Sequence, residues 1–206
     1  MRIAILAIVA FAGGLLIARA VFPPRPAVPP TERATVLSEA KPLPALDLLD
    51  QDGRRLGTDF FKGHWTIVFF GYTSCPDVCP TTLATLAQAL KGMADMPLAE
   101  RPRVLLVTVD PERDDPARLA AYVRFYDPSF LGATGTPAAV AAAAAAFGVP
   151  YAKIALPEGG YTMDHGSGLT IVGPSGAVVA YSSAPHEAPA IVRDYRKVVA
   201  YAEGLR

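Results

Sequence analysis

The two cysteines of the chain, Cys75 and Cys79, lie where an apolar run meets a helical pattern. Their Cys-x-x-x-Cys spacing is one residue wider than the Cys-x-x-Cys of thioredoxin-like redox motifs. If the turn is already helical at Cys75, the two sulfurs share one helix face. The positive end of a helix dipole also stabilises a thiolate. Two converging thiols at this place suit either a soft-metal site or a redox pair.

A metal held by two sulfurs needs a further donor, and the chain has three histidines. His165 lies in a polar, glycine-bearing stretch just before an apolar run, where Asp164 is placed to orient its ring. A ligand or catalytic role and a plain surface or turn position both remain open for His165. His64 precedes an apolar run and His186 stands at a predicted helix start, which favours strand-end and capping positions for them.

The structural alternative for Cys75 and Cys79 is a disulfide that only closes a loop. Closing so short a loop constrains the unfolded chain little, so stability is a weak reason for a disulfide at this place. The functional interpretations, a metal site and a redox pair, are therefore favoured over the structural one.

The elements that must position these residues follow from apolar patterns and helix signals. The run 64–70 is typical of a strand buried on both faces, and Pro80 suits the first turn of a helix over 81–92. An Asp-Gly turn between two short apolar segments predicts an N-terminal β-hairpin within 43–56. Further strands are predicted at 103–109, 151–156, 168–172 and 177–182, and further helices at 115–125, 138–147 and 187–202.

This order of elements predicts an α/β chain with parallel pairing of its central strands. It matches a thioredoxin-like fold, with a central mixed sheet flanked by helices and an added N-terminal β-hairpin. Lys plus Arg and Asp plus Glu each number 19, so no overall charge draws in nucleic acid. We expect no nucleic-acid partner.

The beginning of the chain has the pattern of an export signal or a membrane anchor. Residues 3–17 are free of charged side chains, and Arg19 follows them. Ala18-Arg19-Ala20 has the small-x-small form of a cleavage site, but the arginine and the prolines after it favour an uncleaved anchor. We expect an anchor or signal peptide at 1–22, a Pro-rich linker at 23–40 and one domain at 41–206.

Three strings in this order carry a resemblance that covers the chain from about Lys41 to its C-terminus. They are Gly71-Tyr72-Thr73-Ser74-Cys75-Pro76-Asp77-Val78-Cys79-Pro80, Val107-Thr108-Val109-Asp110-Pro111-Glu112-Arg113-Asp114, and Asp164-His165 before a strand and a Gly-Pro-Ser-Gly turn. With them the chain resembles the SCO/SenC family. The resemblance implies a thioredoxin-like, membrane-tethered copper protein that serves the assembly of cytochrome c oxidase.

The resemblance further implies that Cys75, Cys79 and His165 bind one copper ion, as Cu(I) or Cu(II). It implies a metallochaperone rather than an enzyme, one that delivers copper to the binuclear copper centre of cytochrome c oxidase subunit II. The alternative is a thiol-disulfide oxidoreductase in which Cys75 and Cys79 reduce the cysteines of that centre. A peroxide-reducing relative of the fold has no clear motif here and ranks last.

The partners expected from the resemblance are subunit II and other periplasmic copper chaperones or thioredoxin-like reductants. The N-terminal helix would attach a monomer to the membrane, with its domain on the extracytoplasmic side. That side is the bacterial periplasm or an equivalent oxidising compartment.

Overall fold

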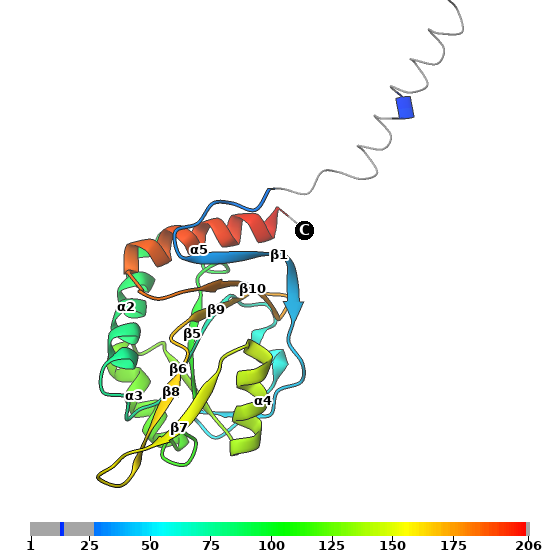
Figure 1. Cartoon of the computed structure of the whole chain (residues 1–206). Helices are drawn as coiled ribbons and strands as arrows, with labels where there is room; N and C mark the ends of the chain where they lie inside the picture. Colours follow the sequence, from blue (N-terminus) through cyan, green and yellow to red (C-terminus); the bar gives the residue numbers. More distant parts are fainter. Residues whose placement is uncertain (1–12, 15–26, 205–206) are drawn as a thin grey trace, which may run out of the picture.

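The computed structural model describes residues 13–14 and 27–204, which form one eight-stranded mixed sheet, a separate two-stranded sheet and flanking helices (Figure 1). The strands are β1 (Ala34–Pro42), β2 (Leu48–Asp50), β3 (Arg55–Leu56), β4 (Thr66–Gly71), β5 (Arg103–Thr108), β6 (Leu131–Thr134), β7 (Tyr151–Ala155), β8 (Tyr161–His165), β9 (Leu169–Val172) and β10 (Ala177–Ser182). The helices are the 3-10 helix η1 (Thr58–Phe61), α2 (Val78–Gly92), α3 (Pro116–Tyr126), α4 (Pro137–Phe147) and α5 (Ala188–Glu203).

The large sheet has the strand order β1-β10-β9-β4-β5-β6-β2-β3, with β4 near its middle. β4 runs parallel to β5 and antiparallel to β9, and all six of its residues are buried. Both faces of this strand are covered, which explains its unbroken apolar sequence. The prediction of a central buried strand in this region is confirmed.

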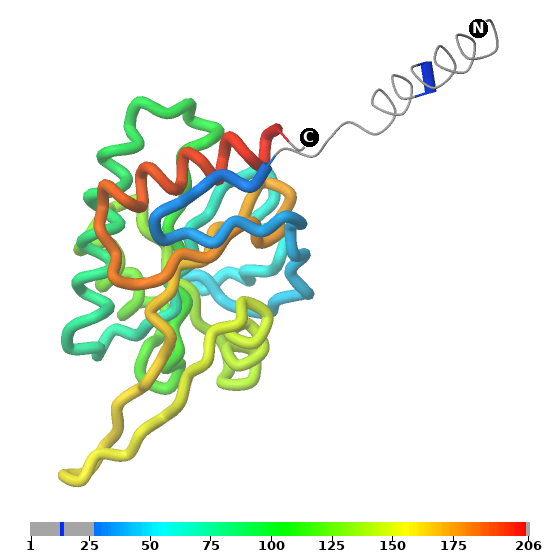
Figure 2. Tube along the Cα trace, turned by 45° about the horizontal axis from the view of Figure 1, so that its top comes forward, coloured from blue at the N-terminus to red at the C-terminus, as the bar shows by residue number. Residues whose placement is uncertain are grey.

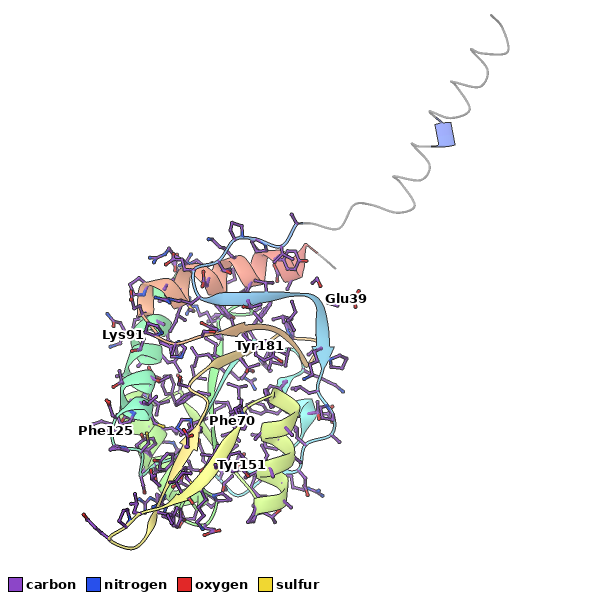
Figure 3. All side chains as sticks on the ribbon, in the orientation of Figure 1. Glu39, Phe70, Lys91, Phe125, Tyr151 and Tyr181 are labelled. Carbon is purple, nitrogen blue, oxygen red and sulfur yellow. The ribbon has the colours of Figure 1, made fainter. Side chains whose placement is uncertain are left out.

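The helices cover the two faces of the sheet unequally. On one face α2 packs against both α3 and α5, and α4 lies on the other face (Figures 1 and 2). Phe147 of α4 contacts Phe70 of β4, with ring centroids 5.4 Å apart. Phe70 is buried in this core, whereas Phe125 of α3 points outward (Figure 3). Successive residues of β4 therefore serve two different layers, and Phe69 and Gly71 face α2.

Two predicted helix starts are built as the sequence indicates. The Asp115 side chain accepts a hydrogen bond from the Arg118 N–H, and the Thr136 hydroxyl accepts one from the Ala139 N–H. A proline follows each cap and fits the first helical turn. The left-handed Gly148, with φ 72°, ends α4 as predicted.

The folded domain begins earlier than the predicted boundary at residue 41. β1 pairs antiparallel with β10, so the second half of the predicted linker 23–40 belongs to the sheet. The Asp194 carboxylate on α5 also accepts hydrogen bonds from the backbone N–H groups of 32–34. β1 is an edge strand in which only Ala34 and Val36 are buried. So short an alternation of apolar and polar residues does not predict a strand.

The N-terminal hairpin is confirmed, because Leu48 of β2 pairs with Leu56 of β3. β6 and β8 were not predicted. The anchor predicted at 1–22 lies outside the described residues except for 13–14. Among the helices that the structure describes, none has the length and apolar character needed to cross a membrane.

Candidate metal centre

The two cysteines flank the start of α2. The helix begins at Val78, so Cys75 lies in the turn after β4 and only Cys79 lies within the helix. The expected i, i+4 pair on one helix face is therefore not formed. Instead the turn carries the Cys75 sulfur back over the helix N-terminus, where the Cys79 N–H donates to Cys75 Sγ at 3.4 Å. Since Asp77 makes no side-chain capping bond, this sulfur takes the place of a cap.

His165 joins the cysteines from a distant part of the chain. The two Sγ atoms and the nearest ring nitrogen of His165 all lie within 4.8 Å of one another, and His165 Nε2 is 3.4 Å from Cys79 Sγ. His165 is the last residue of β8 rather than a loop residue, which corrects the sequence-based expectation. His64 and His186 lie outside this cluster.

The orientation of the imidazole leaves Nε2 facing the sulfurs. His165 Nδ1 lies 3.1 Å from the Gly166 carbonyl oxygen. Because a carbonyl only accepts hydrogen bonds, this contact assigns the proton to Nδ1 and leaves a lone pair on Nε2. The carbonyl of Gly166 thus does what was expected of Asp164. Such a contact fixes both the tautomer and the ring orientation of a metal-binding histidine.

Two aromatic rings hold the imidazole at its sides. The ring of Phe69 is 6.1 Å from that of His165, and the ring of Tyr72 is 5.8 Å away at an interplanar angle of 88°. Both are edge-on contacts of the kind that aromatic pairs prefer. Sequence reasoning missed these two residues, although both stand at the end of the strand that leads into the cysteine turn.

The two thiols differ in their exposure. Cys79 is fully buried and Cys75 is half-buried. A Cβ atom at Gly71 would lie only 2.8 Å from Cys79 Sγ, so the glycine makes the room that this sulfur occupies. Burial raises the pKa of the Cys79 thiol, and a backbone hydrogen bond to Tyr72 opposes part of that rise. A metal that binds here must therefore displace a firmly held proton.

An open pocket of about 300 Å³ gives access to two of the three donors, Cys75 and His165, while Cys79 lies buried behind them. Cys75 and His165 line it together with Tyr72, Pro76, Asp77, Val78, Met163, Asp164 and Ser167. Two thiolates and one imidazole form a donor set that suits a soft or borderline metal ion such as copper. Both cysteines are free thiols, so the sulfurs are available either as ligands or for disulfide exchange.

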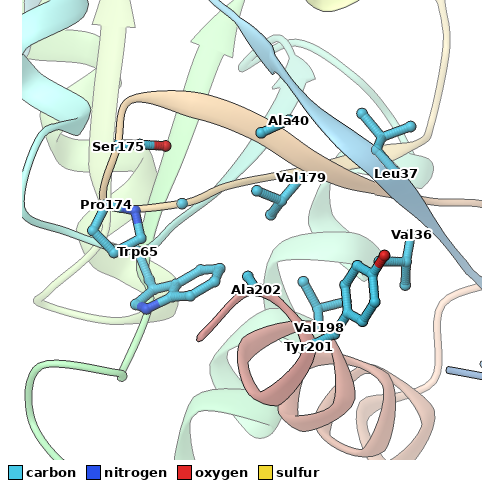
Figure 4. Close-up of a pocket in the computed structure, with 11 residues that line it drawn as sticks. Val36, Leu37, Ala40, Trp65, Pro174, Ser175, Val179, Val198, Tyr201 and Ala202 are labelled. Atoms are coloured by element: carbon cyan, nitrogen blue, oxygen red, sulfur yellow. The ribbon is translucent and has the colours of Figure 1, made fainter. Parts of the chain in front are cut away.

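A different pocket, of about 170 Å³, lies between β1 and α5 (Figure 4). Trp65, Val36, Val198 and Tyr201 are among the residues that line it, and none of its lining residues is a cysteine, histidine or carboxylate. This apolar pocket therefore offers no metal donor. The chemistry-bearing groups gather in the pocket beside α2.

Comparison with known proteins agrees with the geometry. The SCO1/SenC family model matches residues 38–200. The chain belongs to the SCO1/SenC family. A protein of Stutzerimonas stutzeri whose name describes it as copper-binding is 36% identical over 150 residues, which cover 73% of each chain. The mitochondrial SCO2 homolog of Mus musculus is 35% identical over 157 residues, covering 74% of this chain and 60% of the mouse protein.

Solved structures of the family share the architecture. Arabidopsis thaliana ScoI with copper bound has a TM-score of 0.71 at 28% identity, covering 78% of this chain and 98% of that one. Bradyrhizobium japonicum ScoI with copper bound has a TM-score of 0.67 at 32% identity, covering 76% and 99%. The predicted α/β, thioredoxin-like fold class and the family resemblance are both confirmed.

Proposed function

We propose that this SCO1/SenC protein is a copper metallochaperone that serves cytochrome c oxidase assembly. Cys75 Sγ, Cys79 Sγ and His165 Nε2 hold one copper ion, as Cu(I) or Cu(II). The observation that carries the proposal is the convergence of these three soft or borderline donors within 4.8 Å beside an open pocket. Two relatives solved with copper bound give further support.

The copper ion is cargo, and its recipient is the binuclear copper centre of oxidase subunit II. Transfer requires that a donor group of the recipient replace the ligands one after another. Cys75 and His165 are half-buried and line the open pocket, so exchange starts at one of these two donors, while the buried Cys79 retains the ion until last. We place the domain on the extracytoplasmic side of a membrane, held there by residues 1–22.

A thiol-disulfide oxidoreductase is the second candidate, and the half-buried Cys75 thiol beside a second free thiol supports it. The Cys75 thiolate would attack a disulfide of subunit II and form a mixed disulfide, releasing one target thiolate. Cys79 would then attack Cys75 Sγ, which frees the second target thiol and leaves a Cys75–Cys79 disulfide. A thioredoxin-like dithiol reductant would restore the two thiols.

Copper titration of the reduced full-length protein tests the first candidate. We expect one Cu(I) per chain in competition with a chelator of known affinity, and an affinity loss of about 10-fold or more in His165→Ala. The matched control is His64→Ala, because His64 is exposed and lies outside the donor cluster. Stoichiometric binding with unchanged affinity and spectrum in His165→Ala would refute the three-ligand site.

The same preparations decide between the two candidates. If the wild-type protein retains no copper but reduces a model disulfide, and Cys75→Ser abolishes this reduction, the oxidoreductase replaces the metallochaperone. If copper is retained and the disulfide is reduced no faster than by a free thiol, the metallochaperone stands alone.

A further inference from the structure

The strand that carries His165 does not belong to the sheet that carries the cysteine turn. β7 and β8 pair only with each other, and they form a hairpin that reaches away from the main sheet (Figures 1 and 2). The separation between His165 and the two sulfurs therefore depends on the contacts that dock this hairpin onto the domain. A metal centre tolerates ligand displacements of only about 0.2 Å, so these contacts matter for binding.

The loop between β5 and α3, residues 110–114, supplies contacts to both strands of the hairpin. The Asp110 carboxylate is buried and accepts a hydrogen bond from the Tyr161 hydroxyl at 2.9 Å. Glu112 forms an ion pair with Lys153 of β7 at 2.6 Å. Arg113 donates from Nη1 to the Tyr161 carbonyl oxygen at 3.2 Å, and its guanidinium lies 3.9 Å from the centre of the Tyr161 ring.

Arg113 also connects this loop to the residues around the imidazole. Asp110 accepts a hydrogen bond from Arg113 Nε, which fixes the guanidinium. From there the guanidinium lies 5.8 Å from the centre of the Tyr72 ring, whose edge-on neighbour is His165. The Tyr72 hydroxyl is 2.9 Å from the hydroxyl of Thr162 on β8. The loop thus fixes β8 both directly and through Tyr72.

The other end of the same loop holds the cysteine turn. The Asp114 carboxylate is fully buried and accepts from the Thr73 N–H at 2.9 Å, the Thr73 hydroxyl at 2.5 Å and the Thr108 hydroxyl at 2.7 Å. Arg118 donates to the hydroxyls of Thr73 and Ser74, at 2.7 and 3.0 Å. Thr73 and Ser74 are the two residues before Cys75, so these bonds fix the chain that enters the site.

We propose that the loop 110–114 is a positioning device that sets the separation between the two halves of the metal centre. Asp114 holds the cysteine half, and Asp110 with Arg113 holds the histidine half. The backbone N–H groups of Arg113 and Asp114 both donate to the Asp110 carbonyl oxygen, at 3.1 and 3.0 Å, so the loop is one closed turn. The inference rests on the proposed copper site, and Asp110, Arg113 and Asp114 are positioning residues that lie outside the donor set.

A double-mutant cycle on full-length protein separates positioning from general stability. Arg113→Ala should lower Cu(I) affinity about 10-fold to 100-fold, the range found when a group that orients a metal ligand is lost, because Arg113 contacts Tyr161 of β8 and the Tyr72 ring beside His165. Because Arg113 acts through the histidine half, its effect should vanish in a His165→Ala background. Asp114→Asn should also lower Cu(I) affinity, because an amide presents one acceptor oxygen and two N–H donors to groups that all donate. This loss should persist in the His165→Ala background, because Asp114 holds the cysteine half of the site.

Two matched controls belong to the cycle. Asp194→Asn removes another buried carboxylate that accepts three backbone N–H groups, and Arg196→Ala removes another ion-paired arginine, bound to Asp95. Both controls should lower the melting temperature without changing copper affinity. If Arg113→Ala costs as much affinity in the His165→Ala background as in wild type, or if the controls lower affinity equally, the positioning role is refuted.

Two measurements without metal keep this result apart from the proposed function. Amide hydrogen exchange in β7 and β8 should speed up in Arg113→Ala while β4 and β5 keep their protection, and alkylation of Cys75 should speed up in Asp114→Asn. If these changes occur in a protein that binds no copper, the metal proposal fails and the positioning inference stands. Unchanged exchange and alkylation in a protein that binds copper would overturn the positioning inference alone.

Discussion

Substitution of Gly71 by alanine tests whether packing fixes the position of the buried sulfur. Gly71 ends β4 and is buried, and it pairs with Thr108 of β5. Its φ is not positive, so alanine brings no backbone strain of its own. The added Cβ would lie 2.8 Å from Cys79 Sγ, 3.0 Å from Phe69 Cε1 and 3.2 Å from Leu106 Cδ1. The effect of Gly71→Ala is therefore one of overpacking.

The magnitude follows from these distances. Ordinary contact begins at 3.4 Å, so the Cβ and Cys79 Sγ must separate by 3.4 minus 2.8, or 0.6 Å. That displacement is larger than the roughly 0.2 Å that metal-ligand bonds tolerate. Overpacking by one methyl group costs about 1–3 kcal/mol, which lowers the melting temperature of a chain of this size by roughly 2–12 °C. We expect a loss of copper affinity of about 10-fold or more.

The assay combines thermal unfolding of the metal-free protein with Cu(I) competition on folded protein. Gly132→Ala is the matched control. Gly132 lies on β6, away from the donors, and an added Cβ would meet Leu119 Cβ of α3 at 3.1 Å. It should lower the melting temperature and leave copper affinity unchanged. If Gly71→Ala behaves in the same way, the sulfur is not held by packing against the strand end. A Cys79→Ala background should reduce the stability cost of Gly71→Ala, since the nearest atom is gone.

Three further outcomes are expected. Burial alone would raise the pKa of Asp194, but hydrogen bonds from three backbone N–H groups lower it below its ordinary value. The ionised Asp194 therefore stabilises the fold fully above about pH 3.9, and this contribution is lost as pH falls through the lower pKa of the folded state. Asp194→Asn should therefore flatten the acid limb of urea-unfolding free energy against pH, and an unchanged limb would contradict this. Phe147→Ala should lower the free energy of unfolding in urea by about 3–5 kcal/mol. It should leave copper affinity unchanged, because α4 covers the face of the sheet opposite α2. A loss of copper affinity along with stability would contradict this arrangement of layers. Since burial raises the pKa of the Cys79 thiol, Cu(I) affinity should rise with pH between about pH 6 and 8, and a flat profile would show that no thiol proton is displaced.

Local signals allowed much of the fold to be predicted from the sequence. The caps Asp115 and Thr136, each followed by proline, mark helices that the structure contains. The buried run of β4 and the Asp-Gly turn of the N-terminal hairpin are equally local. β8 lacked such a signal, because among its five residues only Met163 is buried. A hairpin that pairs with no other strand needs no apolar alternation, so periodicity does not mark it.

The residues that gather at the candidate site could also be named from the sequence, but their surroundings could not. Residue chemistry and family resemblance indicated Cys75, Cys79 and His165, because thiolates and imidazoles are few in this chain. The contacts of His165 with Phe69 and Tyr72 arise only when β8 crosses the end of β4. No sequence spacing encodes a crossing of that kind, since its partners are more than ninety residues apart.

The unequal environments of the two thiols favour copper binding over disulfide reduction. A resolving cysteine must supply a thiolate quickly, yet burial raises the pKa of Cys79 and disfavours that form. Binding of a metal ion supplies the free energy that removes the proton from Cys79, and copper retention does not require this proton to leave quickly. On the proposed function, the half-buried Cys75, which lines the open pocket, offers a point at which a recipient could begin to take the ion. One buried and one accessible sulfur would thus meet the two demands on the metallochaperone proposed above, which must retain its ion in transit and release it on contact.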